Sequence, residues 1–293
     1  MAGFRLKVAT RLGEKIALDF GFESFPVCPR KIAESRDISV EAKPPEVTGV
    51  SGAIILAGDS AMIIYSTELQ NEGFENFSIA HELGHWFLPG HPEEIAKAGG
   101  MHLSRASFTE NTSIELEADH FASGLLMPSR LTRNLLGESQ IGLDGIVQLA
   151  GVAKTSITAA AIRSAECCPY PVAVIVSKGQ KIAYAFLSEA FKSLGRLSFL
   201  RKGDPLPTSA TSRFNATPEN VRLGRRSTEQ TDLSIWFDGP RDIELDEEVL
   251  GLGGYGYTLT VLSSEELPED PTEADDEDAQ LEESWKPRFA YGR

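Results

Sequence analysis

The spacing of apolar residues predicts a helical N-terminal region that is interrupted by one β-hairpin. Between residues 5 and 21 apolar side chains recur every three or four positions, which predicts an amphipathic helix. A second, shorter helix is expected to start near Pro29. Two apolar, β-branched runs, 50–56 and 61–66, flank a short polar turn and predict a β-hairpin.

Helical periodicity returns after the hairpin. It extends over 76–88, and the glycine-rich segment 90–112 that follows predicts a loop with a short helix. A further helix is expected over 113–126 because Pro128 stops the pattern. Two more helical stretches, 131–136 and 143–164, complete this part of the chain.

The pattern changes to short β-rich runs after residue 168. Runs separated by Gly, Pro and polar turns predict strands at 172–176, 181–186, 232–237 and 257–262. The chain is therefore expected to be an α+β protein. Its first domain, 1–168, would combine helices with a small sheet, and a separate α+β or mostly β domain would occupy 169–263.

Charge is concentrated at the C-terminal end. The formal net charge is −15, and residues 265–283 hold eleven Asp and Glu without a Lys or Arg, so the remainder carries only −4. Low apolar content predicts that 264–293 form a disordered acidic tail. Because binding to a phosphate backbone relies on clustered Lys and Arg, we expect no direct contact with nucleic acid.

Composition also bears on the compartment. No run approaches the ~18 consecutive apolar residues of a membrane span, and the N-terminus lacks the apolar core of a secretory signal. Only three cysteines occur, and two of them, Cys167 and Cys168, are adjacent, which disfavours a disulfide between them. We expect a cytoplasmic protein that does not contact a membrane.

The segment His81-Glu82-Leu83-Gly84-His85 carries the candidate chemistry. On a helix, residues four apart share a face, so His81 and His85 can bind one metal ion with Glu82 beside it. Zn²⁺ held by two imidazoles and one further ligand keeps a position for water, lowers the pKa of that water and polarises a carbonyl. Glu82 can then act as the general base. The pattern predicts zinc-dependent hydrolysis.

A third ligand must come from another segment. The candidates are Glu115, Glu117, Asp119, His91, His102 and His120. Glu115 and Asp119 are four apart on the helix expected over 113–126, so Glu115 can bind the metal while Asp119 accepts the outer N–H of a ligating histidine. Glu117 is expected to project elsewhere.

The sequence leaves the roles of the remaining histidines open. His120 is a possible transition-state or substrate contact, or an exposed helix residue. His91 and His102 lie in the glycine-rich segment, where a substrate contact and a solvated side chain are both compatible with the sequence.

Two motifs together resemble the ImmA/IrrE family of metallopeptidases. They are Ile79-Ala80-His81-Glu82-Leu83-Gly84-His85 and the segment 115–128, Glu-Leu-Glu-Ala-Asp-His-Phe-Ala-Ser-Gly-Leu-Leu-Met-Pro. The resemblance extends over about residues 5–165 and implies a zincin-like metallopeptidase domain with zinc bound by His81, His85 and Glu115. Asp119 stands where the family usually has Asn, and in this respect the second motif is closer to the gluzincin pattern. The Arg that is common shortly before the first motif is absent.

The resemblance also implies a biological role. Relatives cleave helix-turn-helix repressors, and some belong to toxin–antitoxin pairs. We therefore expect a zinc-dependent endopeptidase whose protein substrate is a helix-turn-helix transcriptional repressor or an antitoxin. The alternative is a toxin–antitoxin or sensor module in which the zinc site is mainly structural and the C-terminal domain binds a partner.

One further segment, 145–165, superficially resembles a helix-turn-helix. Its only basic residues are Lys154 and Arg163. Because reading DNA requires a basic surface, a structural helical pair is favoured over DNA binding.

Overall fold

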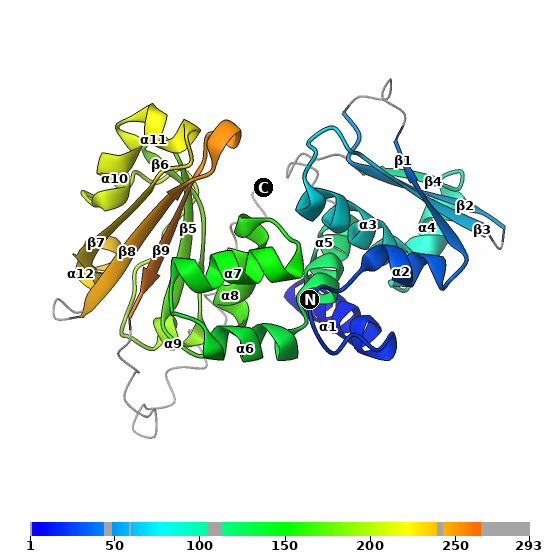
Figure 1. The fold of residues 1–293 in the computed structure, drawn as a ribbon, viewed down its shortest axis with the longest axis horizontal. Helices are drawn as coiled ribbons and strands as arrows, with labels where there is room; N and C mark the ends of the chain where they lie inside the picture. Colours follow the sequence, from blue (N-terminus) through cyan, green and yellow to red (C-terminus); the bar gives the residue numbers. More distant parts are fainter. Residues whose placement is uncertain (1, 44–48, 59, 105–112, 239–242, 265–293) are drawn as a thin grey trace. The chain divides into compact units, whose positions relative to one another are not determined.

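A computed structural model describes residues 2–43, 49–58, 60–104, 113–238 and 243–264 (Figure 1). The chain divides into two compact units. Unit 1 comprises Met1–Thr132 and Ala150–Ala159, and unit 2 comprises Arg133–Leu149 and Ala160–Arg293.

Each unit combines helices with one sheet, which confirms the α+β class. The expected boundary between 1–168 and 169–263 stays a prediction. In the structure, 133–149 and 160–168 group with the later strands. The acidic tail expected over 264–293 lies, apart from Ser264, outside the described residues.

Three helices of unit 1 form its helical layer. Helix α5 (Ser113–Leu126) packs against both α1 (Ala2–Asp19) and α3 (Glu72–Phe87), and the shorter helices are α2 (Pro29–Glu34) and α4 (His91–Lys97). Glycine permits the close approach of α1 and α5, because a Cβ at Gly124 would lie 2.1 Å from the Thr10 carbonyl oxygen. The helices expected over 5–21, near Pro29, over 76–88 and over 113–126 are confirmed.

The sheet of unit 1 has the strand order β1-β3-β2-β4. Its strands are β1 (Ile38–Ala42), β2 (Gly52–Ala57), β3 (Ser60–Tyr65) and β4 (Met101–Ser104). β2 and β3 form the expected hairpin, β1 runs parallel to β3, and β4 runs antiparallel to β2. The segment 90–112 was expected to be a loop with a short helix, so α4 is confirmed and β4 is an addition.

Pairing in β4 places two polar side chains on the inner face of this sheet. His102 pairs with Ile54 and Ser104 pairs with Gly52, so both share a face with the fully buried Ile54. Paired residues in a sheet point to the same side. Helix α3 packs against β2 and β3, so this face is the one that meets the helix.

The sheet of unit 2 has the order β6-β5-β9-β8-β7, with every neighbouring pair antiparallel. Its strands are β5 (Val172–Lys178), β6 (Lys181–Leu187), β7 (Arg226–Asp232), β8 (Glu244–Gly251) and β9 (Thr258–Ser263). The accompanying short helices are α9 (Glu189–Lys192), α10 (Ala210–Asn215), α11 (Pro218–Arg222), α12 (Leu233–Phe237) and the 3₁₀ turn Gly253–Tyr255. A core of aromatic and aliphatic residues, among them Phe191, Trp236 and Phe237, covers one face of the sheet.

The strand expected over 232–237 is wrong. Asp232 ends strand β7, and Leu233–Phe237 form helix α12. Leu233, Trp236 and Phe237 are buried and Ile235 is 42% exposed, which is the i, i+3, i+4 spacing of a helix face. The run was misread because its β-branched and aromatic composition outweighed a periodicity that extends over little more than one turn.

Helices α6 (Ser129–Glu138), α7 (Leu143–Ala153) and α8 (Ile157–Cys167) contain the points at which the chain passes between the units. The single stretch expected over 143–164 is thus two helices, bent by 114°. Among the described helices none is by itself long and apolar enough to span a membrane, and α7 and α8 meet that length and composition test only as this bent pair.

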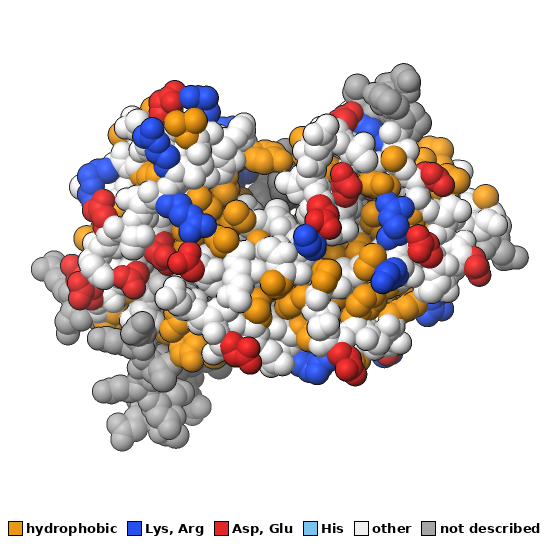
Figure 2. Space-filling model, viewed as in Figure 1, with side chains coloured by type: hydrophobic (Ala, Val, Ile, Leu, Met, Phe, Trp, Pro, Cys, Tyr) orange, Lys and Arg blue, Asp and Glu red, His pale blue; other side chains and the backbone are white. Residues whose placement is uncertain are grey.

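A bend of this size also occurs in helix-turn-helix pairs. However, both basic residues of the segment are engaged elsewhere. Arg163 is buried 2.9 Å from Glu166, and Lys154 forms an ion pair of 3.2 Å with Glu72. These contacts support the prediction of a structural helical pair. On the face drawn in Figure 2, the Lys and Arg side chains of each unit are interspersed with Asp and Glu.

Candidate metal centre

The first motif lies in the buried second half of α3. Asn71 caps the helix by accepting a hydrogen bond of 3.1 Å from the Phe74 N–H. Further along, Gly84 allows α5 to approach, because a Cβ there would lie 3.1 Å from the Ala118 Cα. This close crossing brings the first turn of α5 beside the two histidines of the motif.

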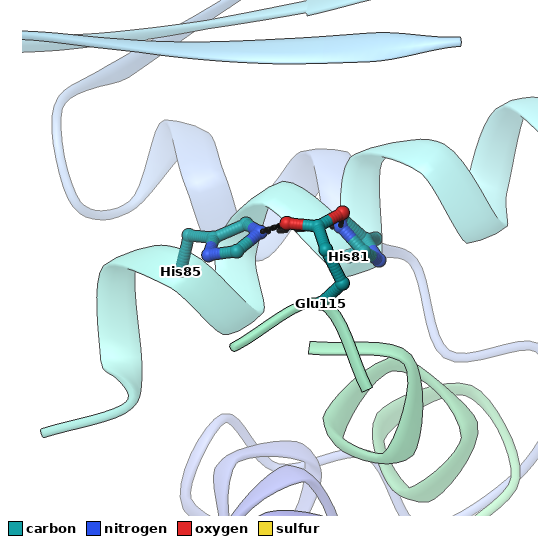
Figure 3. Close-up of side chains that lie close together, drawn as sticks. All are labelled: His81, His85 and Glu115. Carbon is teal, nitrogen blue, oxygen red and sulfur yellow. Dashed lines mark hydrogen bonds and ion pairs between the residues drawn. The ribbon is translucent and has the colours of Figure 1, made fainter. Parts of the chain in front are cut away.

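Three donors converge between α3 and α5 (Figure 3). The Nε2 atoms of His81 and His85 lie 3.2 Å apart. The Glu115 carboxylate lies with Oε2 3.4 Å from His81 Nε2 and with Oε1 3.3 Å from His85 Nε2. In tetrahedral coordination with bonds of about 2.05 Å, neighbouring ligand atoms are ~3.3 Å apart. The triangle therefore fits a metal ion of the size of zinc, and it unites the three residues predicted as ligands.

The outer nitrogens of the two histidines have partners as well. His81 Nδ1 lies 2.8 Å from Asp119 Oδ1, which is the contact expected of Asp119. His85 Nδ1 lies 3.1 Å from His91 Nδ1. Both Nε2 atoms are thereby left to face the third donor.

Electrostatics favour a cation at this position. Burial opposes a positive charge on His81, but its hydrogen bonds with Asp119 and Glu115 outweigh burial and raise its pKa well above the usual value. Burial lowers the pKa of His85 to about 3, which keeps this imidazole neutral. Burial would raise the pKa of Glu115, but hydrogen bonds with His102, His81 and His85 hold it far below its usual range.

Glu82 is fully buried (0% exposed) next to this triangle. The Ser104 hydroxyl donates a hydrogen bond of 2.6 Å to Glu82 Oε1, whereas Oε2 has no hydrogen-bond partner among the described residues. Gly52 makes room for the carboxylate, since a Cβ there would lie 2.6 Å from Oε1. Burial raises the pKa of Glu82 to about 7, against the opposing effects of His81 and Ser104. A carboxylate in this state can exchange a proton near neutral pH.

The structure also brings His102 to the centre. Its Nε2 lies 2.6 Å from Glu115 Oε1, and its side chain is 21% exposed. Burial lowers the pKa of His102, but the bond to Glu115 more than compensates and raises it. The sequence left His102 open because the strand that carries it was not expected.

The two other candidates face α1. His120 Nδ1 lies 3.3 Å from Thr10 Oγ1, and His120 is not part of the donor group. Its role as a transition-state contact stays a prediction. Glu117 pairs with Arg5 at 3.0 Å and so projects away from the triangle, as its position on the helix suggested.

A family model described as the IrrE N-terminal-like domain, Peptidase_M78, matches residues 33–164. Residues 33–164 therefore belong to the ImmA/IrrE family. This IrrE-like domain contains the whole donor group, and the match begins later than the start near residue 5 suggested by the resemblance. A comparison with curated proteins gave no match.

Among solved structures, a transcriptional regulator of Mycobacterium tuberculosis is similar, with a TM-score of 0.55 and 15% sequence identity. The likeness covers 87% of this chain and 76% of that one. At this identity it establishes a shared fold, and it extends beyond the IrrE-like domain.

Proposed function

We propose that this protein is a zinc-dependent endopeptidase that cleaves a specific regulatory protein. The observation that carries the proposal is the state of Glu82, a fully buried carboxylate beside three convergent metal donors, whose Oε2 has no hydrogen-bond partner among the described residues. A buried polar atom without a partner is costly, so its presence calls for a ligand or a chemical role.

In this proposal His81, His85 and Glu115 hold the zinc ion. Zinc supplies a bound water of lowered pKa and polarisation of the scissile carbonyl. Glu82 accepts the proton of the attacking water and returns it to the leaving amine. Ser104 holds Oε1 of Glu82, which leaves Oε2 as the atom that carries the proton.

The proposed substrate is a helix-turn-helix repressor or an antitoxin. Support comes from the family of residues 33–164 and from the fold shared with a protein described as a transcriptional regulator. We further propose that the protein acts in the cytoplasm, where such a substrate is found.

A second candidate function is a toxin–antitoxin or sensor module with a mainly structural zinc site. The fold likeness to the transcriptional regulator favours it, because that likeness includes residues outside the IrrE-like domain. Glu82 distinguishes the two candidates, since a structural site has no use for a buried general base.

The test uses the full chain with a helix-turn-helix repressor encoded in its neighbourhood. We expect about one zinc per chain by mass spectrometry, cleavage detected as new termini, loss of cleavage with a chelator and recovery with added zinc. Glu82→Gln should keep its zinc and lose cleavage, whereas Glu93→Gln, a charge-matched change at an exposed position of α4, should behave as wild type. Cellular function that survives Glu82→Gln but not loss of a zinc ligand would favour the structural alternative.

A further inference from the structure

The Nδ1 atoms of the two proposed metal ligands, His81 and His85, have different partners. His81 faces a carboxylate directly, Asp119, whereas His85 faces a second imidazole, that of His91. His91 is the first residue of α4 and only 1% exposed, so it is enclosed by protein. An imidazole that binds a metal through Nε2 must carry its proton on Nδ1. Something must therefore fix that proton on His85.

The hydrogen bond with His91 does not by itself determine which ring nitrogen of His85 carries the proton. Each neutral imidazole has one donor and one acceptor nitrogen, and two Nδ1 atoms 3.1 Å apart share one hydrogen bond whose direction can run either way. If His91 were the donor, His85 would carry its proton on Nε2, pointing at the position of the metal. If His85 is the donor, its Nε2 keeps a lone pair for the metal.

Glu117 lies on the far side of His91. Its Oε2 is 3.6 Å from His91 Nε2, and this buried nitrogen has no hydrogen-bond partner among the described residues. The carboxylate is itself held in place by Arg5, at 3.0 and 3.1 Å, and by the Ser113 hydroxyl at 2.8 Å. A buried carboxylate facing Nε2 favours the proton on that nitrogen.

We propose that Glu117, acting through His91, sets the tautomer of His85, and that both are positioning residues for this metal ligand. With the His91 proton on Nε2 beside Glu117, His91 Nδ1 is an acceptor and takes the hydrogen bond from His85 Nδ1–H. His85 Nε2 is then left free toward His81 and Glu115. The inference rests on the proposed zinc site, but it concerns a proton that is present with or without the metal.

Tautomers can be read directly in the metal-free protein. Long-range ¹⁵N–¹H correlation spectra of ¹⁵N-histidine-labelled chain distinguish a protonated Nδ1 from a protonated Nε2. In the metal-free protein Glu115 Oε1, 3.3 Å from His85 Nε2, favours the opposite tautomer, so we expect the Nδ1–H form of His85 to be populated in wild type and to decrease in Glu117→Gln. Glu93→Gln removes an exposed carboxylate of α4, the helix that begins with His91, and should leave the spectrum unchanged.

Zinc affinity provides the second readout, measured by competition with a chromophoric chelator. Loss of an outer-shell partner typically weakens metal binding about 10- to 100-fold, and we expect Glu117→Gln and His91→Leu to fall in this range. His91→Asn should stay much closer to wild type, because an Asn Oδ1 can accept from His85 Nδ1–H in place of the ring nitrogen.

The decisive variant combines His91→Asn with Glu117→Gln. An amide oxygen accepts without a choice of tautomer, so the loss caused by Glu117→Gln should disappear in the His91→Asn background. A merely structural role of Glu117 would instead reduce affinity by the same factor in both backgrounds, and that result would overturn the relay.

The outcomes separate the relay from the proposed function. If the wild type binds no zinc while His85 still changes tautomer in Glu117→Gln, the proposed function fails and the relay stands. If the tautomer of His85 does not respond to Glu117→Gln, the relay fails whatever the zinc content. Melting temperatures of the metal-free variants identify any that fail to fold. In that case the relay is tested by comparing His91→Asn with the double variant His91→Asn, Glu117→Gln.

Discussion

Glu82 of α3 and Glu247 of β8 are both completely buried carboxylates, yet they differ in how their oxygens are used. Glu247 Oε1 accepts two hydrogen bonds of 2.7 Å from the backbone N–H and hydroxyl of Thr211, and Oε2 accepts one of 3.3 Å from Trp236 Nε1. In the part of the chain that the structure describes, Glu82 has the Ser104 hydroxyl on one oxygen and no hydrogen-bond partner on the other. Burial of a carboxylate is costly unless hydrogen bonds replace the lost water.

The difference separates structure from chemistry. In unit 2, Glu247 joins α10, which contains Thr211, and α12, which contains Trp236, to the central sheet, so its hydrogen bonds hold elements together. In unit 1, Glu82 is left short of partners where three metal donors meet. An exchange of the acidic group for an isosteric amide should therefore affect stability in one unit and activity in the other.

The largest effect is expected on removal of a metal ligand. His81→Ala, His85→Ala and Glu115→Ala should each lose bound zinc and all hydrolysis, because a site with three protein ligands cannot readily lose one. The measurement is zinc per chain after gel filtration. Full zinc occupancy in Glu115→Ala would show that another residue is the third ligand. His102, 2.6 Å from Glu115, would then be the first candidate to test.

Glu82→Gln should give the next largest effect, on activity alone. The amide cannot accept a proton, so hydrolysis should fall by ~10² to 10⁴-fold, the usual contribution of a general base. Because burial already raises the pKa of Glu82 to about 7, a neutral side chain costs the fold little, and the melting temperature should stay at or above that of wild type. Near-equal cleavage by this variant would show that another residue is the base.

Glu247→Gln should instead lower the stability of the fold and leave the activity unchanged. The amide oxygen can still accept from Thr211, but the amide nitrogen would face Trp236 Nε1–H, which leaves a buried donor without an acceptor. An unsatisfied buried donor costs about 1–3 kcal/mol, so urea unfolding should show a loss of this order. Zinc content and the rate per folded molecule should not change. A fall in rate with unchanged stability would remove the contrast between the two glutamates.

Of these two glutamates, only Glu82 can be recognised as a site residue from the sequence alone. His81, Glu82 and His85 are recognisable because metal-ligand spacing on a helix is local, and Glu115 follows from a second helix with a readable pattern. Glu247 stands between Asp246 and Glu248, and an acidic triplet reads as solvent-exposed loop. In the structure these residues alternate across β8, and Glu248 Oε2 accepts a hydrogen bond of 2.7 Å from the Leu143 N–H on the other face.

The parts of the fold that were missed share a physical reason. β7 and β8 are polar along most of their length, so they lack the apolar alternation by which strands are recognised, and their pairing with distant segments supplies the order instead. Pairing with β2 likewise orders β4, a run of only four residues whose apolar side chains, Met101 and Leu103, are exposed while His102 and Ser104 lie at the centre. A run this short, with its polar side chains inward, is not recognised as a strand from the sequence.

The smallest effect is expected from Ser104→Ala, and it tests how Glu82 is held. The Ser104 hydroxyl is the one hydrogen-bond donor to the Glu82 carboxylate among the described residues. Its loss should reduce kcat/KM by roughly tenfold, in line with about 1–1.5 kcal/mol for one hydrogen bond. Ser78→Ala is the matched control, because that buried serine of α3 donates to the Phe74 carbonyl and forms no hydrogen bond with Glu82 among the described residues.

A pH profile separates this effect from a general loss of structure. The bond from Ser104 lowers the pKa of Glu82, so its removal raises that pKa. A general base works only when deprotonated, and activity falls as pH drops through its pKa. The acidic limb of kcat/KM should therefore move to higher pH in Ser104→Ala and stay in place in Ser78→Ala. A tenfold loss without movement of the limb would mean that Ser104 supports the site by packing, and that the orientation of Glu82 comes from the close fit of Gly52 against its carboxylate.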